Sequence, residues 1–152
     1  MALLRIPDKT LLEDWLADAE MDCYLCGQCD GLHIRALQGG SGVIDSRLFI
    51  EDYGLLLTTE LEIRPGSLLQ VSADLGRLNM DYPTLKLFLD VADEVVPQLV
   101  VAGNFLTGAG LSQDQFGHFM ATSIEATEHL AETCRQLSYL YTADESGRSL
   151  LH

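Results

Sequence analysis

The longest regular pattern in the chain, residues 112–141, limits its possible folds more than any other feature. Large apolar side chains recur there on one side at helical spacing, and polar side chains lie opposite. Ser112 and Gln115 have the spacing of a capping box, so we expect a helix from Ser112 to about Tyr141. Each large side chain that it buries contributes roughly 1.5–3 kcal/mol, which makes this helix a main support of the core. The apolar side consists of Phe116, Phe119, Met120, Ile124, Leu130, Cys134, Leu137 and Tyr141.

A first helix is expected over residues 8–19. Thr10 and Glu13 have the spacing of a capping box, and Asp8 is a competing N-cap. Its apolar face is narrow, so this helix should dock onto a larger element.

A second helix is expected from Pro65 to Leu78, because proline suits the first turn of a helix. Ser67 and Gln70 have the spacing of another capping box. The apolar side chains of this helix exceed what docking on a sheet requires, so part of them is assigned to a dimer interface. The assigned residues are Leu68, Leu69, Val71 and Leu75.

The remaining segments have the sequence pattern of antiparallel strands. Between residues 21 and 64, short apolar runs alternate with glycine and aspartate turns, and the clearest strand is 55–63 with one buried and one wet face. A hairpin follows over residues 85–102, in which Phe88 breaks the alternation, as in a strand covered on both faces. The order is therefore α-β-β-β-α-β-β-α. This order predicts an α+β fold with an antiparallel sheet of about five strands and helices packed on it.

The length and the charge of the chain limit the functions that it can have. A chain of 152 residues suits a single domain, residues 1–152, with 143–152 expected to form a poorly ordered tail. Nine Lys and Arg against 23 Asp and Glu give a net charge of −14, which disfavours direct binding to nucleic acid or anionic membranes. The acidity indicates either solubility alone or a partner with a basic surface. No signal peptide or membrane span is recognisable, so we expect a soluble, cytoplasmic protein.

Several segments resemble the enterobacterial members of the YbjN family of bacterial sensory transduction regulators. They are residues 26–33, 64–69, 86–90 and 97–101, together with Leu151-His152. The resemblance implies a fold like that of class I type III secretion chaperones, and a homodimer. It also implies roles in stress response, motility and repression of exopolysaccharide production and virulence traits.

Cys23, Cys26, Cys29 and His33 form the most reactive pattern in the sequence, with Cys134 far downstream. Three thiolates and an imidazole can hold zinc, and three cysteines can bind part of an iron–sulfur cluster. Cys26 and Cys29 also have the spacing of a thiol–disulfide switch, although an acidic neighbourhood should raise their pKa values. Free thiols are the default alternative for cytosolic cysteines.

No pattern in the sequence assembles a nucleophile, a base and an oxyanion hole, and none indicates a cofactor. We therefore expect a protein that is not an enzyme and that regulates through protein–protein contacts. Two alternatives remain open. One is a metal- or redox-dependent sensor that uses Cys23, Cys26, Cys29 and His33, and the other is a chaperone for a specific client.

Overall fold

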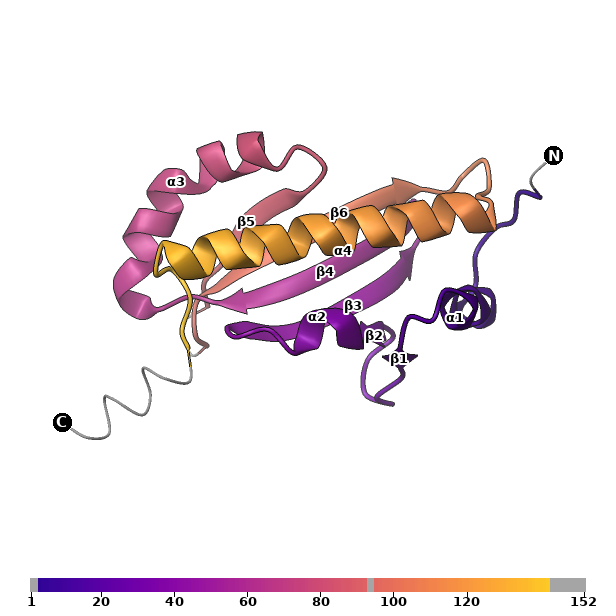
Figure 1. Ribbon diagram of the computed structural model, residues 1–152, viewed down its shortest axis with the longest axis horizontal. Coiled ribbons are helices and arrows are strands. Elements are labelled where there is room, and N and C mark those ends of the chain that lie inside the picture. The colour runs from indigo at the N-terminus through magenta and orange to yellow at the C-terminus, as the bar shows by residue number, and fades with distance from the viewer. Residues whose placement is uncertain (1–2, 93–94, 143–152) are drawn as a thin grey trace.

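The computed structural model describes residues 3–92 and 95–142, which form one antiparallel sheet with helices on it (Figure 1). The predicted tail, 143–152, lies outside these residues. The elements, in chain order, are α1 (Lys9–Asp18), β1 (Cys23–Tyr24), β2 (Leu32–Ile34), α2 (Arg35–Gln38), β3 (Val43–Glu51), β4 (Gly54–Glu62), a 3-10 turn (Pro65–Ser67), α3 (Leu68–Asp81), β5 (Lys86–Asp90), β6 (Gln98–Leu106) and α4 (Gln113–Gln136).

The α+β class and the antiparallel sheet are confirmed, but the strand count is wrong. In the described residues the sheet has six strands in the order β1-β2-β3-β4-β6-β5, all neighbours being antiparallel. The short strand β1 extends the edge, and the apolar runs near Val43 and Leu48 belong to the single strand β3. The short helix α2 was not predicted.

The long helices of the described chain, α1, α3 and α4, pack on one face of this sheet. Their buried side chains share two apolar clusters with the inward side chains of β4 and β6, such as Leu57 and Val101. In Figure 1, α4 runs along the sheet, with α1 near one end of it and α3 near the other. The predicted alternation of β4 is confirmed, because Leu57, Thr59 and Leu61 are buried while the residues between them are only partly covered. We call the opposite side of the sheet the open face.

The open face carries Tyr24 and His33 at one edge and Lys86, Phe88 and Asp90 at the other. Phe88 is 40% exposed, so the prediction that both faces of this strand are covered is wrong. The reason is position, since β5 is an edge strand that helices cover on one side only.

The first helix begins at Asp8, whose carboxylate accepts a hydrogen bond from Leu11 N–H at 2.8 Å. The competing N-cap therefore replaces the predicted Thr10–Glu13 capping box. The helix ends in a Schellman-type turn, in which Met21 N–H donates to the Leu16 carbonyl and Glu20 takes a φ of 57°.

The Ser67–Gln70 capping box is also absent from the described structure. The Ser67 hydroxyl donates instead to the Ser138 carbonyl at 2.9 Å, and the Gln70 amide donates to Asp74. Ser67 thereby ties the start of α3 to the segment after α4.

The residues assigned to a dimer interface differ in their exposure to solvent on α3. Val71 is completely buried in the core of the chain, so it cannot belong to a surface. Leu69 is 85% exposed, while Leu68 and Leu75 are half-buried. The dimer interface stays a prediction, now centred on Leu69.

The capping box of α4 is confirmed by both of its hydrogen bonds, Gln115 N–H to Ser112 Oγ and Ser112 N–H to Gln115 Oε1. The helix ends at Gln136, however, and not near Tyr141. Ser138 takes a φ of 61°, and the chain turns so that Leu140 bridges to Ile63 beside β4. Among the described helices, none is both long and apolar enough to cross a membrane.

Candidate functional site

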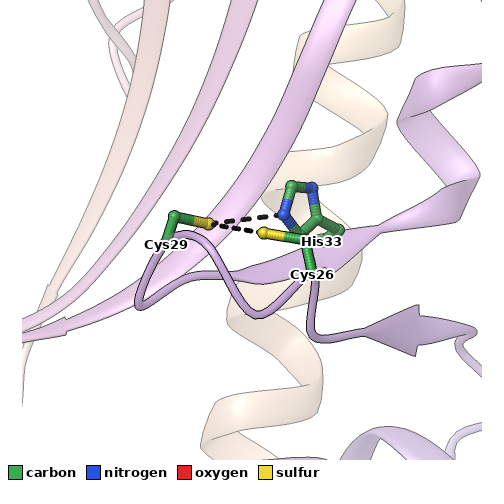
Figure 2. A group of neighbouring side chains, drawn as sticks. All are labelled: Cys26, Cys29 and His33. Carbon is green, nitrogen blue, oxygen red and sulfur yellow. Dashed lines mark hydrogen bonds between the residues drawn. The ribbon is translucent and has the colours of Figure 1, made fainter.

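Cys26, Cys29 and His33 lie together in the turn between β1 and β2 and at the start of β2 (Figure 2). Their ligand atoms all lie within 4.8 Å of one another. The Cys26 and Cys29 sulfurs are 3.4 Å apart, and Cys29 Sγ is 3.4 Å from His33 Nε2. Gly27, with a φ of 79°, lets the turn reverse between the two cysteines, because that backbone region strains other residues. We call these three residues the Cys26–Cys29–His33 centre.

The imidazole of this centre is held firmly. His33 is only 6% exposed, and its ring stacks on Tyr24 with centroids 4.7 Å apart. Its Nδ1 lies 3.1 Å from Asp45, which leaves Nε2 directed at Cys29. The Asp45 carboxylate also accepts hydrogen bonds from Gln38 at 2.9 Å and from Ser46 N–H at 2.8 Å. The ring therefore has a fixed position and a fixed hydrogen-bonding direction.

A charged pair continues from the centre across the open face. Arg47 is paired with His33 in the β2–β3 register, and its guanidinium forms an ion pair with Glu60 on β4. Arg47 also contacts Cys29 and lies 4.0 Å from Asp45. Polar contacts thus link β2, β3 and β4 on the side of the sheet opposite the long helices α1, α3 and α4.

The pKa values of the centre move in opposite directions. Hydrogen bonds from Gln28 N–H, His33 and Cys29 lower the pKa of Cys26 to about 6, and its side chain is exposed. Burial lowers the pKa of His33, but hydrogen bonds to Cys26, Asp45 and Cys29 outweigh it and raise the value to about 9. The expectation that acidic surroundings raise the pKa of these thiols is wrong for Cys26, because local donors dominate.

Cys23 does not belong to the centre, contrary to the sequence pattern. It pairs with Ile34 in the β1–β2 register and packs against the core, whereas Tyr24 and His33 are on the open face. Burial, followed by the charges of Glu13 and Asp22, raises the pKa of Cys23. Cys134 lies on the buried side of α4, and burial raises its pKa to about 12. Neither sulfur is placed to act with Cys26 and Cys29.

Sequence reasoning did not find Asp45, Gln38 or Tyr24, which orient His33. Asp45 is twelve residues from His33 and reaches it only through the pairing of β2 with β3. The sole local signal is an acidic residue directly after the apolar pair Val43-Ile44. Chemically, the centre offers two sulfurs and one imidazole nitrogen, a set that can bind a soft metal ion or form a disulfide.

The chain is similar to known proteins over most of its length. A family model described as "YbjN: Putative bacterial sensory transduction regulator" matches residues 8–136. The chain is 30% identical over 149 residues to "Uncharacterized protein YbjN" of Escherichia coli (strain K12), which covers 98% of this chain and 94% of that protein. The same figures hold for the protein of that name from Shigella flexneri.

The chain is also similar to solved structures. The crystal structure of "YbjN, a putative transcription regulator from E. coli" has a TM-score of 0.89 and 30% identity, and covers 93% of this chain and all of that one. An uncharacterized protein from Methanothermobacter thermautotrophicus has a TM-score of 0.52 at 11% identity, covering 86% of this chain and 98% of its own, and this likeness concerns the fold alone.

Proposed function

The chain belongs to the YbjN family, and from that premise we propose that it is a non-enzymatic regulator that senses through Cys26, Cys29 and His33 and acts by binding other proteins. The input is a reaction of the two sulfurs and the imidazole. The output is a change in contacts made by the open face of the sheet.

One observation carries this proposal: the Cys26–Cys29–His33 centre borders a sheet face that the long helices α1, α3 and α4 leave uncovered within the described chain. Among the described helices, only the short helix α2 touches this face, through Gln38 and Arg35 beside Tyr24. Antiparallel sheets often leave one face to solvent, so exposure alone indicates nothing. Here, however, the face combines an exposed phenylalanine, Phe88, with polar contacts that run from His33 to Glu60. A change at the cysteines would therefore alter side chains of the same surface that meets a partner.

Charge supports a partner of a particular kind. The chain carries a net charge of −14, and complementary potentials favour the encounter of two proteins. We therefore expect the partner to present a basic surface. The same charge argues against direct contact with nucleic acid, so control of transcription would be indirect.

The wider roles implied by family resemblance are part of the proposal. They are action in the cytoplasm, homodimer formation, a secretion-chaperone-like fold class, and links to stress response, motility, exopolysaccharide production and virulence. The cytoplasm suits the four free cysteines, because reducing compartments keep thiols unpaired.

The two lysines of the chain allow a direct test of the open face. Lys86 is exposed on β5 at that face, and Lys9 begins α1 on the helical side. Amine-reactive crosslinking in cells, read by mass spectrometry, should give adducts between a partner and Lys86. Phe88→Asp should abolish them, and Met80→Asp, an equally drastic change at an exposed position on α3, should not.

The sensory part has its own readout in the same experiment. Cys26→Ser should change the yield of Lys86 adducts, and Cys23→Ser should leave it unchanged. Adducts that form through Lys9 and persist in Phe88→Asp would overturn the proposed binding face. An unchanged yield in Cys26→Ser would overturn the sensory role.

A further inference from the structure

The donor atoms of the Cys26–Cys29–His33 centre have nearly the spacing that a tetrahedral metal ion requires. A zinc ion bound to sulfur at about 2.3 Å places neighbouring ligand atoms about 3.7 Å apart. The two sulfurs are 3.4 Å apart, as are Cys29 Sγ and His33 Nε2. The third pair, Cys26 Sγ and His33 Nε2, lies within 4.8 Å, so small side-chain rotations would bring all three atoms around one ion.

The imidazole is already oriented as a metal ligand would be. Metal-binding histidines usually direct the second ring nitrogen at a carboxylate or carbonyl, which fixes the tautomer and the ring position. In this chain Nδ1 faces Asp45 at 3.1 Å, and Nε2 faces the sulfurs. Asp45 itself is held by Gln38 and by the backbone of Ser46. Outer contacts of this kind distinguish a built site from a chance encounter of two cysteines.

We propose that Cys26, Cys29 and His33 bind one Zn²⁺ ion through two thiolate sulfurs and Nε2, with water as the fourth ligand. The inference deepens the sensory role proposed above, and it rests on that role only for its regulatory meaning. Two sulfurs and one imidazole form a donor set that zinc favours. An iron–sulfur cluster would need further cysteines, and the structure places Cys23 and Cys134 elsewhere.

The charge balance of the centre suits a divalent ion. Two thiolates neutralise Zn²⁺, and the histidine ligates as a neutral ring, so the bound unit adds no net charge. The nearest cation, Arg47, is already paired with Glu60. On binding, the ion takes the place of whatever protons the two sulfurs and Nε2 carry, and these protons pass to solvent.

The site is open on one side, since Cys26 is exposed while His33 is buried. Structural zinc sites usually have four protein ligands, whereas sites with three keep one position for an exchangeable group. An ion held by three ligands at the surface can be gained and lost, which is the property that a sensor requires.

Metal titration of the purified full chain, without a histidine tag, tests the inference. The reduced protein is stripped with a chelator and titrated with Zn²⁺ against a chromophoric competitor, and Co²⁺ serves as a spectroscopic probe of thiolate ligation. We expect one ion per chain. Cys26→Ser, Cys29→Ser and His33→Gln should each weaken binding by more than about 100-fold, because even outer contacts are worth 10–100-fold.

Cys23→Ser is the matched control, since it removes a nearby thiol that lies outside the centre, and it should bind zinc like the wild type. Thermal unfolding of each apo variant separates lost ligation from lost folding, and zinc should raise the Tm of the wild type and of Cys23→Ser only. Absence of binding in the wild type, or equal loss in Cys23→Ser, would overturn the inference.

Failure of zinc binding is distinguishable from failure of the proposed function. If zinc does not bind but Cys26→Ser still changes the Lys86 crosslinks, the zinc site is refuted and the sensory role stands. If zinc binds with the expected variant pattern but the crosslinks do not respond to Cys26→Ser, the zinc site stands and the sensory role is refuted.

Discussion

Replacing Asp45 by asparagine tests whether the centre is organised for a metal ion. Asp45 Oδ1 accepts hydrogen bonds from Gln38 and from Ser46 N–H, and an asparagine oxygen can keep both. Both Asp45 oxygens lie 3.1 Å from His33 Nδ1, and the asparagine amide takes the place of Oδ2. A neutral ring that binds zinc through Nε2 must carry its proton on Nδ1, and an amide, which donates, opposes that proton. Only Oδ1, already shared with Gln38 and Ser46 N–H, then remains to accept it.

The expected effect follows from this single lost contact. Removal of an outer carboxylate typically lowers metal affinity 10–100-fold, which corresponds to about 1.4–2.7 kcal/mol. All three ligands stay in place, so one zinc ion per chain should still bind at saturation. Competition with a chromophoric chelator at fixed pH and salt measures the change.

Asp90→Asn is the control for the change in charge. Asp90 is exposed on the open face of β5, three strands away from β3, or about 14 Å at the usual strand spacing. The Asp90→Asn variant should bind zinc with an affinity within about twofold of the wild type, because salt screens charges at that distance. Unchanged affinity in Asp45→Asn, or equal weakening in Asp90→Asn, would show that the carboxylate does not orient His33 for metal.

Three further changes test the fold and the dimer. Gly54→Ala should lower the free energy of unfolding by about 3–5 kcal/mol in urea titrations. The reason is that Gly54 has a φ of 153° and that a Cβ there would lie 2.0 Å from the Phe105 carbonyl oxygen. The control, Gly66→Ala, has open space around it and should lower that free energy by less than about 1 kcal/mol. Glu20→Gly should raise that free energy by about 1 kcal/mol, because it relieves a left-handed residue at the end of α1, and a loss of stability would contradict this. Leu69→Asp should convert a dimer into a monomer in sedimentation while the chain stays folded, as its side chain is 85% exposed; a wild-type monomer at micromolar concentration would refute the interface.

Elements whose signals are local could be predicted from the sequence. The capping box at Ser112 and the alternation along β4 each depend on residues a few positions apart, and both are present. The end of α4 could not be predicted in this way. Helices commonly stop at a glycine, but here Ser138 takes the left-handed conformation, and contacts from Arg64 and Ser67 to its carbonyl hold the turn. The apolar pattern predicts a helix to about Tyr141, but tertiary contacts end α4 at Gln136.

The candidate site shows the same division. The spacing of Cys26, Cys29 and His33 marks a centre in the sequence, but the exclusion of Cys23 depends on strand register. A one-residue step along β1 moves a side chain from the open face to the core, and register arises from pairing between distant segments. Asp45 likewise reaches His33 only because β2 pairs with β3. A single sequence carries no direct signal of either pairing.

The position of the polar contacts also bears on their role. Partly buried ion pairs seldom stabilise a fold beyond what apolar side chains would provide in their place, because removing charges from water offsets their attraction. The core of this chain lies on the other side of the sheet, where two apolar clusters join the helices to the inward side chains of the strands. The fold therefore has no evident need for His33, Asp45, Arg47 and Glu60 on the open face. What these residues do share is contact with the two cysteines or with one another, so their arrangement is better explained by the chemistry of that centre than by stability.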